Sequence, residues 1–241
     1  MQRFDHDELA RESEEIRLAL AARGYVHLKG ERSFERFEEL AARLGTIKLR
    51  SDVISDPARD AEQRRTRTFG PHRPGTYSAG ELDFHSDNPT WNVLGFYCAA
   101  QDEHAGSNLL LDLAHVSGSF TREELTALCH VRIYLPLRDE NGQEIAGEVP
   151  LLTETRGGYD VYWVPWLVVE RCEATYSELL NRFRAWIRHE EETGLIELRL
   201  EPGECLLIHN NRMLHGRRKL KSDTRRHLIR LAIAADNLRA G

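Results

Sequence analysis

Apolar residues recur at helical spacing near the start of the chain. One apolar stripe runs along residues 7–24, and Gly24 is a natural helix end. The short stretch 25–28 (YVHL) then alternates like a strand. A second amphipathic pattern covers residues 33–45, with Ser33 as its predicted N-cap. The pattern therefore predicts two helices separated by a short strand.

Residues 46–80 show neither the helical nor the strand period. The segment is rich in arginine, aspartate, proline and glycine, as in DPARDAEQRRTRTFGPHRPG. A loop of this length inside a compact domain is usually a binding loop, a lid or disordered. We therefore expect a lid loop over residues 46–80, with an ordinary surface loop as the alternative.

Beyond residue 81 the chain breaks into short apolar runs of β character, bounded by glycine, proline, asparagine or acidic turns. These runs cover residues 93–99, 107–113, 131–137, 159–166, 196–200 and 204–209. A helix over residues 175–194 and a shorter helical turn over 120–129 interrupt them. We therefore expect a mostly β, α+β fold, a jelly-roll or barrel-like sheet with N-terminal and inserted helices, in one domain spanning residues 1–241.

Composition narrows the functional classes. The chain has 241 residues, is 41% hydrophobic and carries a net charge of −6, which favours neither nucleic acid nor an anionic membrane as a partner. No apolar run approaches the roughly 20 residues that span a bilayer. The charged N-terminus does not read as a signal peptide, and the four cysteines form no CxxC pair. We expect a cytoplasmic protein.

Two histidines and one aspartate are candidate metal ligands. His85 and Asp87 lie two positions apart in FHSDNP, and His215 lies in NNRMLHGRR. Two histidines and a carboxylate hold Fe(II) on one face and leave the other positions for a co-substrate and dioxygen. A lone His-X-Asp is more often an ordinary polar turn, so the interpretation depends on the downstream segments.

Arg226 strengthens the metal-site interpretation. It lies eleven residues past His215, in RRHLIRLAIA, a run that otherwise looks buried. Arginine binds a carboxylate through two parallel N–H donors, which suits the far carboxylate of 2-oxoglutarate. The alternative is an exposed edge strand protected by basic residues.

The segments FHSDNP, GSNLLLDL, NNRMLHGRR and RRHLIRLAI occur in an order and at spacings that resemble the taurine dioxygenase-like superfamily of Fe(II)/2-oxoglutarate oxygenases. They look closest to its γ-butyrobetaine and trimethyllysine hydroxylase branch. The resemblance implies a double-stranded β-helix core, Fe(II) bound by His85, Asp87 and His215, and 2-oxoglutarate bound by Arg226 with Asn108. It identifies the chemistry better than the substrate.

The sequence departs from that branch at several positions. Asn108 stands where a serine or threonine usually contacts 2-oxoglutarate, and its amide can still donate. His209 stands where the branch usually has an aspartate, either near the metal or as a core histidine. The separate N-terminal domain of the carnitine-pathway enzymes has no counterpart here, so their substrates are not carried over. Asp87 excludes the halogenase variant of the fold, which has glycine or alanine there.

Several residues are candidates for the substrate side. Arg230 lies four positions after Arg226, on the same face of an extended strand, and can either contact an anionic substrate or form a surface ion pair. Aromatic residues can line the pocket, although strand aromatics more often belong to the core: Tyr77, Trp91, Tyr162, Trp163 and Trp166. Loop arginines can close over an anion or form a solvated face: Arg64, Arg65, Arg67 and Arg73.

The sequence thus predicts an Fe(II)- and 2-oxoglutarate-dependent dioxygenase that hydroxylates a small polar metabolite, such as an amino acid or a related acid. Its partners would be the substrate, 2-oxoglutarate and dioxygen, with homo-oligomerisation left open. Two alternatives remain: a non-catalytic jelly-roll module that binds a small anion or a structural metal, and a metal-assisted hydrolase. The hydrolase alternative gives Arg226 no function.

Overall fold

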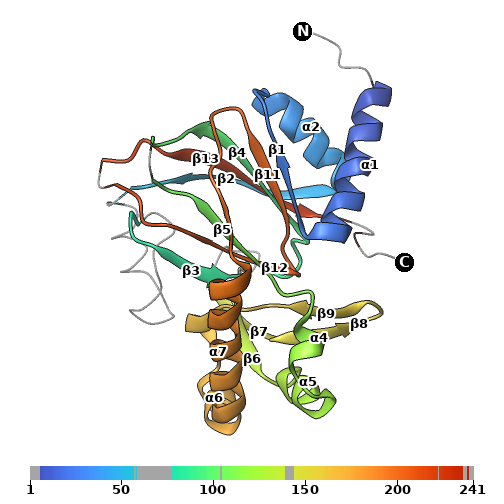
Figure 1. Cartoon of the computed structure of the whole chain (residues 1–241), viewed down its shortest axis with the longest axis vertical. Coiled ribbons are helices and arrows are strands. Elements are labelled where there is room, and N and C mark those ends of the chain that lie inside the picture. The colour runs from blue at the N-terminus through green and yellow to red at the C-terminus, as the bar shows by residue number, and fades with distance from the viewer. Residues whose placement is uncertain are drawn as a thin grey trace.

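The structure is a computed structural model that describes residues 6–56, 58, 78–103, 105–138, 144–221, 223–235 and 238. Within these residues the secondary structure is mainly antiparallel strands, with helices at the N-terminus and between strands (Figure 1). No helix in the described part of the chain combines the length and the apolar character needed to cross a bilayer.

The larger sheet has five strands, in the order β1-β11-β4-β13-β2. All of its pairs are antiparallel, and strands distant in the sequence lie side by side. The strands comprise β1 (Tyr25–Leu28), β2 (Thr46–Ile54), β4 (Val93–Ala100), β11 (Cys205–His209) and β13 (His227–Ala234).

A four-stranded sheet, β10-β5-β12-β3, packs against the larger one. Its strands are β3 (Leu82–His85), β5 (Asn108–Asp112), β10 (Ile196–Leu198) and β12 (Met213–Arg217). The two sheets share one apolar cluster: Leu110 and Met213 of the smaller sheet meet Leu94, Ile208 and Leu228 of the larger one. Two antiparallel sheets closed over a common core confirm the predicted jelly-roll architecture.

Two helices cover the outer face of the larger sheet: α1 (His6–Arg23) and α2 (Phe34–Leu44). The predicted N-cap of α2 is present, because the Ser33 hydroxyl accepts a hydrogen bond from the Arg36 amide at 3.2 Å. Phe37 and Leu44 of α2 are fully buried against the strands.

The remaining elements form a second layer below the sheets (Figure 1). Two hairpins, β6-β7 and β8-β9, and several helices pack around a separate apolar cluster that includes Phe120, Trp163 and Phe183. The elements are α4 (Val116–Ser119), α5 (Arg122–Leu128), β6 (Arg132–Arg138), β7 (Glu144–Pro150), β8 (Leu152–Thr155), β9 (Gly158–Val161), the 3-10 helix η1 (Pro165–Leu167), α6 (Glu170–Thr175) and α7 (Ser177–Gly194).

The lid loop predicted over residues 46–80 is wrong in its first part. Thr46–Ile54 is strand β2, which pairs with β13 along its length. Its exposed and half-buried residues alternate, and Ile47, Leu49 and Val53 occupy the inner positions. This period of two was a readable signal, masked by the charged residues on the outward face. Most of the remaining predicted lid, residues 59–77, lies outside the described residues.

Candidate active site

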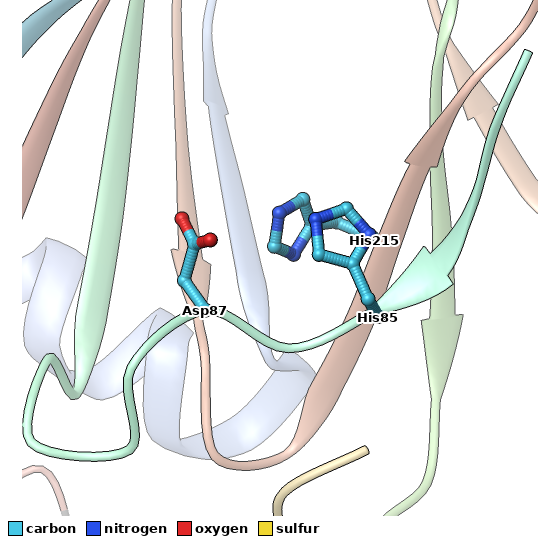
Figure 2. Close-up of side chains that lie close together, drawn as sticks. All are labelled: His85, Asp87 and His215. Carbon is cyan, nitrogen blue, oxygen red and sulfur yellow. The ribbon is translucent and has the colours of Figure 1, made fainter. Parts of the chain in front are cut away.

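The sheet register brings together the three predicted metal ligands. His85 is the last residue of β3, and it lies opposite His215 of β12 in the antiparallel pair. The two imidazole rings are 4.3 Å apart between centroids. Asp87 follows just beyond the end of β3, and one ligand atom from each residue lies within 4.8 Å of the others (Figure 2). The three side chains therefore converge as a metal site requires.

A buried asparagine fixes the segment that carries Asp87. The Asn210 carbonyl oxygen accepts from the Asp87 amide at 3.0 Å, and its Nδ2 donates to the carbonyls of Asp87 and Asn88 at 3.3 and 3.2 Å. The preceding Ser86 amide donates to the Trp163 carbonyl at 2.8 Å. The sequence pattern predicts no role for Asn210, which directly follows the apolar run 204–209. Its position, five residues before His215, was the available signal.

The surroundings of His85 and His215 favour the forms of the two imidazole rings that can bind a metal. Nδ1 of His85 lies 2.7 Å from the Asp83 carbonyl, which can only accept, so Nδ1 carries the proton and Nε2 the lone pair of the neutral ring. Burial and the neighbouring His85 lower the pKa of His215 to about 3, so this imidazole is neutral at physiological pH. A neutral imidazole is the form that binds a metal.

Asp87 is ionised in the same setting. Burial acts to raise its pKa, but Arg230 and the two histidines outweigh it and lower the pKa to about 2. Arg230 donates from Nη1 to Asp87 Oδ2 at 2.6 Å and from Nε to the Ser51 hydroxyl at 3.2 Å. The predicted substrate-side arginine thus lies against the carboxylate of the candidate metal site, and it also lines the adjoining cavity.

Arg226 is a buried cation at another part of the same cavity. Its side chain is 3% exposed, and Nη2 donates to the Asn108 carbonyl oxygen at 2.9 Å. Its Nε has no hydrogen-bond partner among the described residues. Gly106 adopts a φ of 78°, and a Cβ there would come within 2.7 Å of Arg226 Cδ, so a side chain at this position would collide with the arginine. Asn108 and Gly106 thus both contact or closely approach the Arg226 side chain and fix its position.

A second buried arginine, not singled out from the sequence, lies on the same wall. Arg217 is 4% exposed and donates from Nη2 to the carbonyls of Ser78 and Gly80 at 2.5 and 2.7 Å. Burial lowers the pKa of Arg217 to about 10, and burial together with nearby Arg217 does the same for Arg226. Neither guanidinium forms an ion pair within the described part of the chain, which suits a site for an anion.

The triad and these arginines line one cavity of about 510 Å³. Three of the predicted aromatic residues line it as well: Trp91, Tyr162 and Trp166. Trp163 instead packs in the core, with its ring centroid 5.2 Å from that of Phe183. Asn108 also lines the cavity, whereas His209, at the end of β11, does not. Tyr77 and the loop arginines Arg64, Arg65, Arg67 and Arg73 lie outside the described residues.

A jelly roll that brings two histidines and a carboxylate to one cavity is the architecture of non-haem iron oxygenases. The family model described as "Taurine catabolism dioxygenase TauD, TfdA family" matches residues 3–232. The chain therefore belongs to this dioxygenase family. No curated protein sequence gives a significant match.

Solved structures share the fold at low identity. An asparagine oxygenase, solved with Fe(II), 2S,3S-3-hydroxyasparagine and succinate, is 17% identical, with a TM-score of 0.67 over 94% of this chain and 79% of that one. The non-heme iron oxygenase OrfP, solved with Fe, succinate and (3S)-hydroxy-L-Arg, is 18% identical, with a TM-score of 0.66 over 95% and 84%. A putative α-ketoglutarate-dependent taurine dioxygenase from Burkholderia xenovorans is 14% identical, with a TM-score of 0.65 over 98% and 86%.

Proposed function

We propose that the protein is an Fe(II)- and 2-oxoglutarate-dependent oxygenase that hydroxylates a carbon of a small polar metabolite, such as an amino acid or a related acid. In that reaction one oxygen atom of dioxygen enters the substrate and the other enters succinate, while carbon dioxide leaves. The observation that carries the proposal is the pairing, within one cavity, of a His-Asp-His cluster with Arg226, a buried cation that has no acidic partner among the described residues.

His85, Asp87 and His215 would hold the iron. Two neutral imidazoles and one carboxylate fit Fe(II), and the low pKa values of Asp87 and His215 keep both residues in their ligating forms. When bound, Fe(II) supplies the activation of dioxygen. The protein orients the ligands: Asn210 fixes the Asp87 backbone, and the Asp83 carbonyl fixes the His85 ring.

Arg226 would bind the far carboxylate of 2-oxoglutarate. Its buried guanidinium offers N–H donors that find no acid among the described residues. Asn108 would act by holding that guanidinium through its carbonyl oxygen, rather than by donating to the co-substrate. This differs from the role expected of the usual hydroxyl residue at this position.

Two finer points of function stay predictions. Membership of the γ-butyrobetaine and trimethyllysine branch rests only on motif resemblance. The amino-acid substrate class is supported by the asparagine oxygenase and OrfP complexes, which contain hydroxylated amino acids. A non-catalytic module that binds a small anion would also explain the buried arginines, but not the convergent His-Asp-His cluster. A module that holds a structural metal would explain the cluster, but not the buried Arg226 in the same cavity.

Iron binding and succinate formation test the proposal together. We expect wild-type protein to bind one Fe(II) per chain anaerobically and to form succinate from 2-oxoglutarate in air. His85→Ala, Asp87→Ala and His215→Ala should each lose both properties. His115→Ala is a matched control because its side chain is exposed and lies outside the cavity. Full succinate formation by any triad variant would overturn the assignment.

A further inference from the structure

The cavity wall beside the triad is almost entirely apolar. It is formed by the segment 162–167 and by Leu135 of β6, and it includes Val164, Trp166 and Leu167. The Trp166 ring lies 5.4 Å from the His85 ring between centroids, so this wall begins next to the candidate metal site. The hydroxyl of Tyr162 is already used, since it donates to the Tyr134 carbonyl at 3.3 Å.

The larger sheet also lines the cavity, and its lining residues are apolar apart from Arg230 of β13. The apolar ones are Leu49 and Val53 of β2, Phe96 of β4 and Leu228 of β13, and Trp91 lines the cavity as well. A ligand that fills this space would contact aliphatic and aromatic side chains from both the sheet and the second layer. Such a space favours an apolar molecular body.

The charged groups of the cavity are strongly unbalanced. Among the described lining residues the cations are Arg217, Arg226 and Arg230, and the only carboxylate is Asp87. Asp87 already accepts a hydrogen bond from Arg230 and is a candidate metal ligand. Among the described lining residues, an ammonium or guanidinium group on the substrate would therefore meet positive charge and no free counter-ion. Burying a cation without a partner is strongly unfavourable.

We propose that the substrate is a carboxylic acid with an apolar aliphatic or aromatic body and no cationic group. This inference rests on the proposed oxygenase function and narrows its substrate range from amino acids and related acids to the acids that carry no amino group. The carboxylate is recognised by the excess of arginine, and the apolar body lies between the wall of residues 162–167 and the sheet. Trp166 orients that body beside His85.

Pairs of ligands that differ only in the amino group test the proposal on wild-type protein. Anaerobic protein loaded with Fe(II) and 2-oxoglutarate is titrated calorimetrically with 3-phenylpropanoate and L-phenylalanine, and with 4-methylpentanoate and L-leucine. We expect the amine-free acid of each pair to bind at least about tenfold more tightly. Equal or tighter binding of the amino acids, or failure of every apolar acid to bind, would overturn the substrate class.

The same titration separates this inference from the function on which it rests. Binding of 2-oxoglutarate to the Fe(II) protein is measured before any substrate is added. If it does not bind, the oxygenase proposal fails, and the substrate class fails with it. If it binds and the amino acid of each pair then binds as tightly as the amine-free acid or more tightly, the function stands and only the substrate class is wrong.

A matched pair of tryptophan variants locates the apolar body. Trp166 lines the cavity, whereas Trp186 packs in the same second-layer cluster without lining it. Both indole nitrogens are buried without a partner among the described residues, so the two truncations are comparable. Trp166→Ala should weaken the apolar acid at least about tenfold and leave 2-oxoglutarate affinity unchanged. Trp186→Ala should change neither, and an equal loss in both variants would contradict the placement.

Discussion

Replacing Arg226 by glutamine separates the free-energy cost of burying a cation from the contribution of that cation to 2-oxoglutarate binding. Burial, with Arg217 nearby, lowers the pKa of Arg226 from 12.5 to about 10. A fall of that size corresponds to about 3 kcal/mol of free energy, because each pKa unit is worth roughly 1.4 kcal/mol. Both the folded and unfolded values lie above pH 7, so the whole cost is present at neutral pH. The arginine therefore destabilises the ligand-free protein.

Arg226→Gln removes this charge and retains an amide able to donate to Asn108. The shorter side chain loses some packing, so we expect a net gain of about 1 kcal/mol in the free energy of unfolding without ligand. Loss of a hydrogen bond to a charged group costs about 1.5–3 kcal/mol, which raises the dissociation constant of 2-oxoglutarate by roughly ten- to a hundredfold. Stability and co-substrate affinity should therefore change in opposite directions.

Urea denaturation of the Fe(II) protein under anaerobic conditions measures both effects. At a concentration about 100 times the wild-type dissociation constant, 2-oxoglutarate should stabilise the wild type by about 2.7 kcal/mol and the variant by only about 0.4–1.4 kcal/mol. Arg225→Gln is the matched control, since Arg225 is exposed and adjacent in the sequence. A variant that is less stable without ligand, yet keeps wild-type affinity for 2-oxoglutarate, would refute the reasoning.

Two further substitutions test the residues that position the site. Asn210→Ala removes the side-chain hydrogen bonds to Asp87 and Asn88, so Fe(II) affinity should fall by roughly ten- to a hundredfold in an anaerobic metal titration. Unchanged affinity would show that the backbone segment of Asp87 keeps its conformation without Asn210. Asn108→Leu leaves Arg226 Nη2 without its acceptor, so it should weaken 2-oxoglutarate binding by roughly tenfold while Fe(II) affinity stays constant. A parallel loss of Fe(II) affinity would show that Asn108 does more than position Arg226.

The sequence by itself determined the elements whose pattern is local. The helices α1 and α2 follow from apolar residues at helical spacing and from the Ser33 cap, and both appear where the pattern predicts them. The identities of the candidate ligands also follow from the sequence, because His-X-Asp and the distant His-Gly-Arg occur in characteristic segments. Strand β2 was missed because its charged outward residues weaken the apolar signal of a half-exposed strand.

The tertiary structure decided which polar residues meet. The hydrogen bonds between Asn210 and Asp87 join residues 123 positions apart, and that between Arg226 and Asn108 joins residues 118 apart. Such contacts depend on strand order and register across the two sheets, and no local period encodes them. For the same reason only the fold revealed Arg217 beside Arg226 and the apolar wall next to His85. The local sequence identified the candidate site residues, and long-range packing set their distances, their charge states and the shape of the cavity between them.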